Sequence, residues 1–159
     1  MKKIYLTVVL IATSFTQNIF AQDSTKQAQI HQLLSLYYDV KDGLVAGNAD
    51  IAASKAEAFV TVTKSVGYKL TSEGNIKSLA EYALKISQTK DLKKQRDYFS
   101  NFSTGIIALS KTVKLSDKPI YLAYCPMKKA SWPSNEKVIK NPYYGSSMLT
   151  CGEVTETLE

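Results

Sequence analysis

The sequence predicts a mainly all-α fold, an antiparallel four-helix bundle followed by an irregular C-terminal unit of short strands and turns. The first observation behind this prediction is that apolar residues recur at helical spacing in four successive segments between residues 26 and 114. The second is that all four prolines, both cysteines and the only tryptophan lie between Pro119 and Val154. Amphipathic helices joined by short connectors are typical of antiparallel bundles.

The first two helices are expected at about residues 26–46 and 48–66. Their apolar side chains recur every three or four residues, which indicates one buried face on each helix. Gly47 ends the first helix, and Asn48 or Asp50 can cap the second. The predicted core residues are Ile30, Leu33, Leu34, Tyr37, Val40, Leu44, Ala52, Ala56, Phe59, Val62 and Val66.

The third and fourth helices are expected at about residues 76–88 and 91–114, after a small polar connector. Asp91 is a good N-cap for the fourth helix, whose apolar spacing is typical of the seam of a packed bundle. Gly105 lies inside that helix and indicates a close contact with a neighbour. The predicted core residues are Ile76, Leu79, Ala80, Ala83, Ile86, Leu92, Phe99, Phe102, Ile106, Leu109 and Val113.

The C-terminal unit, residues 119–154, is expected to contain two short strands. Residues 120–124 are a short β-prone run whose side chains would alternate between two faces, and residues 148–154 are the second candidate strand. Between them we expect a helical turn over residues 134–139 and a tight turn at Asn141-Pro-Tyr-Tyr-Gly145. If the two strands pair antiparallel, Cys125 and Cys151 come together.

Residues 1–21 have the layout of a secretory signal peptide. Two lysines precede an apolar run from Ile4 to Phe15, and Ala21 offers a small residue at the cleavage point. The run is too short for a comfortable membrane span, so we expect cleavage rather than the alternative, an uncleaved anchor. The mature chain, residues 22–159, is then expected to be one exported, periplasmic domain, with no membrane span after signal cleavage.

Charge and motifs exclude several function classes. The formal net charge is +6, but the lysines are spread along the chain and Arg96 is the only arginine, so we expect a solvated surface and no nucleic-acid partner. The sequence has no nucleophile elbow, no phosphate-binding loop and no His-Glu metalloprotease helix. Cys125-Pro-Met127 is not a Cys-x-x-Cys motif, which disfavours thioredoxin-like exchange. We therefore expect a protein that is not an enzyme.

Four sulfur residues form the candidate site. Both internal methionines lie within three residues of a cysteine, and thiolate with thioether is a ligand set that suits Cu(I). In a strand, Cys125 and Met127 would share a face. The alternative is a structural disulfide with the methionines as core residues. The candidate metal ligands are Cys125, Met127, Met148 and Cys151.

His31 is the only histidine, and a lone histidine on an amphipathic helix is usually a surface or half-buried residue. Without a second histidine, a histidine-based zinc or Cu(II) site is not expected. Trp132, Tyr143 and Tyr144 are expected to pack against the helices; shielding the sulfur atoms from water is their functional alternative.

Several motifs resemble one family. The Cys-Pro-Met run at Cys125, Trp-x-Ser at Trp132 and Asn-Pro-Tyr-Tyr-Gly-x-x-Met-Leu-x-Cys-Gly-Glu-Val from Asn141 are similar to the C-terminal signature of domain-of-unknown-function family 3347. The segment from Val40 to Ala46 and the Arg-x-x-Phe-x-x-Phe-Ser segment at Arg96 resemble its upstream motifs. This sequence departs from the family's usual residues at three positions, none of which is a sulfur residue: Gly43, Lys128 and Pro133.

The resemblance implies an exported, largely helical protein that occurs alone or attached to heavy-metal efflux adaptors. Carried over by motif position, the same four sulfur residues are the candidate ligands. The function expected first is a periplasmic module that binds a soft metal, Cu(I), in copper or heavy-metal handling. Its possible partner is a heavy-metal efflux adaptor or another envelope protein. The alternative is a non-enzymatic envelope interaction domain stabilised by a Cys125–Cys151 disulfide.

Overall fold

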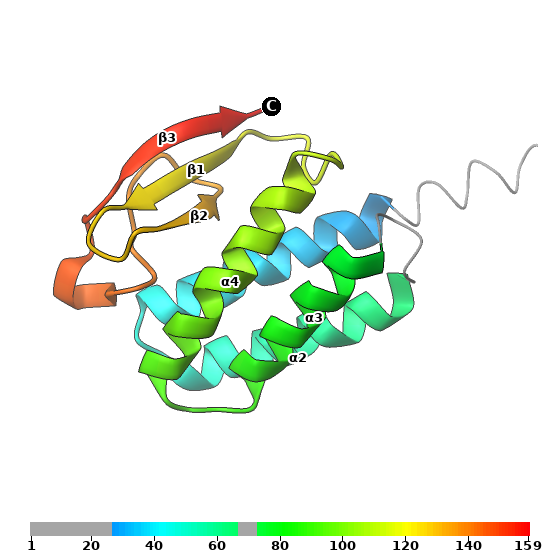
Figure 1. Cartoon of the computed structure of the whole chain (residues 1–159), viewed down its shortest axis with the longest axis horizontal. Helices are drawn as coiled ribbons and strands as arrows, with labels where there is room; N and C mark the ends of the chain where they lie inside the picture. Colours follow the sequence, from blue (N-terminus) through cyan, green and yellow to red (C-terminus); the bar gives the residue numbers. More distant parts are fainter. Residues whose placement is uncertain (1–26, 67–72) are drawn as a thin grey trace, which may run out of the picture.

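The computed structural model describes residues 27–66 and 73–159, in which four helices precede a small three-stranded antiparallel sheet (Figure 1). The described part of the chain is thus mainly helical with a C-terminal sheet, as predicted. The predicted signal peptide and its cleavage site lie outside the described residues. The elements are a first helix at residues 27–45, α2 (Ala49–Val66), α3 (Glu73–Ser87), α4 (Leu92–Ser110), β1 (Ile120–Cys125), β2 (Ala130–Ser134), the 3₁₀ helix η1 (Gly145–Met148) and β3 (Glu153–Leu158).

Side-chain caps begin two of the helices where the sequence predicts. The Asp91 carboxylate accepts the backbone N–H of Lys93 at 2.9 Å and of Lys94 at 3.2 Å, which starts α4. Asn48 starts α2, because its side-chain oxygen accepts the N–H of Ile51 at 3.0 Å. These short-range bonds satisfy helix N–H groups that have no partner within the helix.

The end of α4 differs from the prediction. We expect this helix to reach residue 114, whereas it ends at Ser110. The hydroxyl of Ser110 donates to the carbonyl of Ile107 at 2.9 Å, and the hydroxyl of Thr112 donates to that of Leu109 at 3.0 Å. Such hydroxyls compete with backbone N–H groups for helix carbonyls, which favours an end to the helix here.

Aromatic side chains fill the core between the first helix, α2 and α4. The ring of Tyr37 stacks on Phe99 with centroids 5.3 Å apart, and Phe59 meets Phe102 edge-on at 4.8 Å. The Tyr37 hydroxyl forms a 2.8 Å hydrogen bond with the Ser103 hydroxyl, so this buried polar group is satisfied. The first helix is thereby fixed against α4, although the two are far apart in sequence.

Most of the predicted core residues are buried. The side chain of Val66 lies outside the described residues. A Cβ atom built at Gly105 would lie only 2.7 Å from Leu79 Cδ2, which confirms a close contact between α4 and α3. Among the described residues, none of the helices is both long and apolar enough to span a membrane. The predicted core residues that are only half-buried are Val62, Ala80, Leu92 and Val113.

The sheet has the order β2-β1-β3, so β1 is its central strand. Ala123 of β1 pairs with Trp132 of β2 on one side and with Val154 of β3 on the other. Strand β2 packs against α4, whereas β3 is an edge strand that is exposed over nearly its whole length (Figure 1). The antiparallel pairing of the two predicted strands is confirmed.

Two expectations for this unit are wrong. The helical turn expected over residues 134–139 is absent, because Ser134 ends β2 and its hydroxyl accepts the N–H of Glu136 at 3.1 Å in a local turn. The strand expected from Met148 begins only at Glu153, since residues 145–148 wind into η1. The sequence does not predict strand β2, because Pro133 lowers the strand propensity of this segment. As an edge strand, β2 tolerates the backbone N–H group that Pro133 lacks.

Candidate functional site

The sheet brings the two cysteines together, as the sequence predicts. Cys125 is the last residue of β1, and Cys151 lies just before β3, which pairs with β1. Their Sγ atoms are 3.3 Å apart. A disulfide bond is about 2.05 Å long, and two sulfurs on one tetrahedral metal ion are roughly 3.8 Å apart for metal–sulfur bonds near 2.3 Å. Small shifts therefore convert this pair into either arrangement.

The turn that follows β1 supplies hydrogen bonds to Cys125. Residues 126–129 form the tight connection to β2, with Lys129 in the left-handed region at φ +54°. The backbone N–H groups of Lys128 and Met127 and the side chain of Asn141 each act to lower the pKa of the Cys125 thiol. Hydrogen bonds of this kind stabilise a thiolate.

The two thiols differ in acidity. Burial alone raises the pKa of Cys125, but the hydrogen bonds from Lys128, Cys151, Asn141 and Met127 outweigh it, and the pKa is lowered overall. The pKa of Cys151 is raised, first because its thiol donates to Cys125 and then by burial. Cys125 is fully buried whereas Cys151 is half-buried, so the pair is open to solvent on the Cys151 side.

Asn141 holds the two halves of the site together. Its side-chain N–H donates to the carbonyl of Cys151 at 2.7 Å, and its side-chain oxygen accepts the N–H of Tyr143 at 2.8 Å and of Tyr144 at 3.3 Å. The residue is completely buried. The sequence predicts the turn but not this role of Asn141, although an Asn directly before Pro is a known signal for side-chain bonds to the following backbone.

Aromatic residues form the inner wall of the site. Trp132 is buried and meets Tyr143 edge-on at 5.8 Å, and Tyr143 also packs against Phe99 of α4 at 5.9 Å. Burial raises the pKa of Tyr143, whose hydroxyl donates to the carbonyl of Ser131 at 2.7 Å. The packing predicted for Trp132 and Tyr143 is confirmed, and it fixes the cysteine pair to the helical scaffold.

Gly152 is expected to be intolerant of substitution. Its φ is +139°, and a Cβ atom there would lie 2.8 Å from the Tyr124 carbonyl oxygen and 2.9 Å from Trp132. We expect Gly152→Ala to lower the free energy of unfolding by about 2–4 kcal/mol, from backbone strain and overpacking. Urea denaturation measures this loss. Gly47→Ala is the control, because φ is +69° but the nearest neighbour is 4.0 Å away; equal losses at both sites would contradict the steric argument.

The methionines are close to the cysteines in sequence, but Met127 does not lie in the strand as predicted. Met127 is in the turn after β1, because the strand ends at Cys125, so the expectation of a shared strand face is wrong. Its side chain is 64% exposed and is therefore not fixed by packing. Met148 is half-buried at the end of η1, and its carbonyl accepts the N–H of Cys151 at 3.1 Å.

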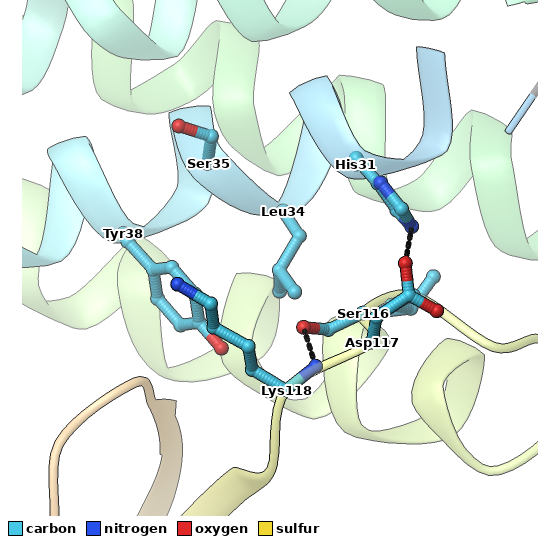
Figure 2. A pocket seen from close by; sticks show the side chains of 8 residues that line it. His31, Leu34, Ser35, Tyr38, Ser116, Asp117 and Lys118 are labelled. Carbon is cyan, nitrogen blue, oxygen red and sulfur yellow. Dashed lines mark hydrogen bonds and ion pairs between the residues drawn. The ribbon is translucent and has the colours of Figure 1, made fainter. Parts of the chain in front are cut away.

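His31 lies at the other end of β1 from the cysteines. Its Nε2 atom is 3.9 Å from the carboxylate of Asp117, which precedes β1, whereas Cys125 ends that strand. Five residue steps separate the strand's ends, roughly 16 Å at about 3.3 Å per step. Figure 2 shows His31 and Asp117 facing each other at a pocket of about 270 Å³ that Leu34 and Tyr38 also line. His31 is thus not brought to the sulfur pair.

Among the described residues, no group of three or more His, Cys, Asp or Glu side chains is placed to hold a metal ion. A structural zinc ion takes four such ligands, and the cysteine pair supplies two. The sulfur residues predicted as ligands add two thioethers, those of Met127 and Met148, to the two thiols. Soft ligands in this number suit Cu(I) better than zinc.

Comparison with known proteins gives one match. A family described as protein of unknown function (DUF3347) matches residues 33–118, a range that begins within the first helix, includes α2, α3 and α4, and ends before Cys125. No curated protein and no solved structure matches the chain.

Proposed function

The chain belongs to the DUF3347 family, and from this premise we propose that it is a binding module for a soft monovalent metal ion, Cu(I), held by Cys125 and Cys151. The observation that carries the proposal is the cysteine pair at 3.3 Å, in which hydrogen bonds lower the pKa of Cys125. A metal ion binds the thiolate form of cysteine, so a stabilised thiolate is a ligand that is already prepared.

The ligand set matches Cu(I) in softness and in charge. Two thiolates on a monovalent ion leave one net negative charge at the site. The thioethers of Met127 and Met148 can complete the coordination without adding charge, and soft sulfur ligands select Cu(I) over harder ions. The side chain of Met127 is exposed and free to change rotamer, which suits a protein that receives and passes on its metal.

The proposed setting is the periplasm, after export and cleavage near Ala21. There the protein would serve copper or heavy-metal handling, with an efflux adaptor or another envelope protein as its partner and without enzymatic activity. We also propose that the helices form an antiparallel four-helix bundle. In support, α3 packs on both α2 and α4, and Tyr37 joins the first helix to α4.

Metal affinity should depend on pH in a defined way. Cu(I) must displace any proton on its two thiols. At pH values between the lowered pKa of Cys125 and the raised pKa of Cys151, the binding of Cu(I) displaces one proton. In this range the affinity for Cu(I) should rise about tenfold for each unit by which the pH rises. Below the pKa of Cys125 two protons are displaced, and the rise should steepen to about a hundredfold per unit. Chelator competition across a pH series measures the slope, and an affinity that does not change with pH would contradict thiolate ligation.

The second candidate is an envelope interaction domain held by a Cys125–Cys151 disulfide, and the same short separation favours it. Oxidation of the two cysteines to a disulfide would remove two hydrogens from the chain, and neither sulfur would remain as a thiolate that can bind copper. Native mass spectrometry of protein purified without oxygen separates the candidates. We expect the reduced mass and the retention of one added copper ion. A chain two hydrogens lighter that retains no copper would support the disulfide domain, and the double Cys→Ser variant is the control for adventitious copper.

A further inference from the structure

A pocket of about 200 Å³ lies between α4, the turn after β1 and the loop before η1. None of the four sulfur residues lines this pocket, although Lys128 and Tyr143 adjoin both the pocket and the cysteine pair. Three of its lining residues come from α4 and are charged. The lining residues are Lys93, Arg96, Asp97, Lys128, Tyr143 and Tyr144.

The charges of this pocket are not balanced. Lys128 Nζ donates to the carboxylate of Asp97 at 2.6 Å, so these two residues neutralise each other. Lys93 and Arg96 have no carboxylate partner among the side chains that the structure describes. The pocket lining therefore keeps a net charge of two positive units.

Backbone contacts hold Arg96 in place. Its Nε donates to the carbonyl of Pro142 at 3.1 Å, and one terminal nitrogen donates to that of Leu44 at 3.0 Å. Gly145 permits this packing, because a Cβ atom there would lie 2.6 Å from that terminal nitrogen. A guanidinium has five N–H donors, so three remain after these two bonds. A fixed group with free donors loses little entropy on binding.

We propose that this pocket binds a small oxyanion, a carboxylate or a phosphate group, with Arg96 as its main ligand and Lys93 as a second. The planar guanidinium matches the oxygen spacing of both groups. The volume is enough for one such group. This proposal stands independently of metal binding.

If Arg96 had only a structural role, substitution of its neighbour Lys93 would have no specific effect. Tying the first helix to the loop uses only the two carbonyl bonds and needs no contribution from Lys93. The test therefore changes charges around Arg96 rather than Arg96 itself, which the fold requires.

The experiment titrates the full chain with inorganic phosphate and, separately, with succinate at constant ionic strength, followed by NMR chemical shifts. We expect saturable shifts at the pocket with either probe. Lys93→Gln should weaken binding about fivefold, because it removes about 1 kcal/mol of charge attraction. Asp97→Asn should strengthen binding several-fold, because it removes the internal competitor for Lys128. Lys94→Gln, an exposed neighbour outside the lining, should change affinity less than about twofold.

The two probes distinguish phosphate from carboxylate as the preferred oxyanion. Saturation with either probe supports oxyanion binding in the pocket. The proposal is overturned if the chemical shifts do not saturate with either probe up to about 10 mM. A dissociation constant of that size corresponds to a binding free energy of only a few kcal/mol. It is also overturned if Lys93→Gln and Lys94→Gln weaken binding equally, since that result indicates general surface charge.

Discussion

Replacing either Cys125 or Cys151 with serine is expected to weaken Cu(I) binding by more than about 100-fold. Changes that only orient a metal ligand already cost about 10–100-fold, so the loss of a ligand should cost more. Each substitution also removes one of the two negative charges that neutralise the ion. The affinity of reduced protein is measured by competition with a Cu(I) chelator under anaerobic conditions.

The matched controls are Met127→Leu and Met148→Leu. These swaps nearly conserve volume, so the free energy of unfolding should change by less than about 1.5 kcal/mol. Their affinities should fall less than those of the serine variants, and least for Met127, whose side chain is mostly exposed. If all four variants compete as well as the wild type, the sulfur atoms are structural and the disulfide domain is the better account.

Asn141→Ala is expected to produce the largest loss of stability outside the helical core. It removes the partners of three backbone groups: the carbonyl of Cys151 and the N–H groups of Tyr143 and Tyr144. A buried group left without a partner costs about 1–3 kcal/mol, so the free energy of unfolding should fall by about 3–5 kcal/mol. For a chain of this size, that lowers the melting temperature by roughly 10 °C or more.

Thermal and urea denaturation measure this loss, with Asn135→Ala as the control. Asn135 is exposed in the bend after β2, so its removal should change stability by less than about 0.5 kcal/mol. The copper affinity of Asn141→Ala should also fall, because the Asn141 side chain helps to lower the pKa of Cys125 and holds the carbonyl of Cys151. Equal stability of the two alanine variants would show that Asn141 does not hold the site together.

The helical part of the fold could be predicted because its signals are local. Apolar spacing of three and four residues identifies the buried face of each helix, and Asn48 and Asp91 identify two of the helix starts. The end of α4 could not be predicted from the apolar pattern. It depends on hydrogen bonds that the hydroxyls of Ser110 and Thr112 donate to carbonyl groups of the helix, and the spacing of apolar residues carries no information about such bonds.

The C-terminal unit was predicted less well because long-range contacts determine it. The meeting of Cys125 and Cys151 follows from a strand pairing that the sequence suggests. Strand β2 depends instead on packing against α4, which overrides the weak β-character of its sequence. The roles of Asn141 and Arg96 depend on bonds to residues far along the chain, for which a single sequence carries no periodic signal.

X-ray absorption at the copper edge determines directly whether Cys125 and Cys151 are ligands of Cu(I). The full chain is reduced, loaded with one Cu(I) per molecule without oxygen, and measured beside the double Cys→Ser variant. We expect the copper ion to be coordinated by sulfur alone, and we expect the double variant to lose this coordination. A shell dominated by nitrogen or oxygen, or the same spectrum from both proteins, would contradict it.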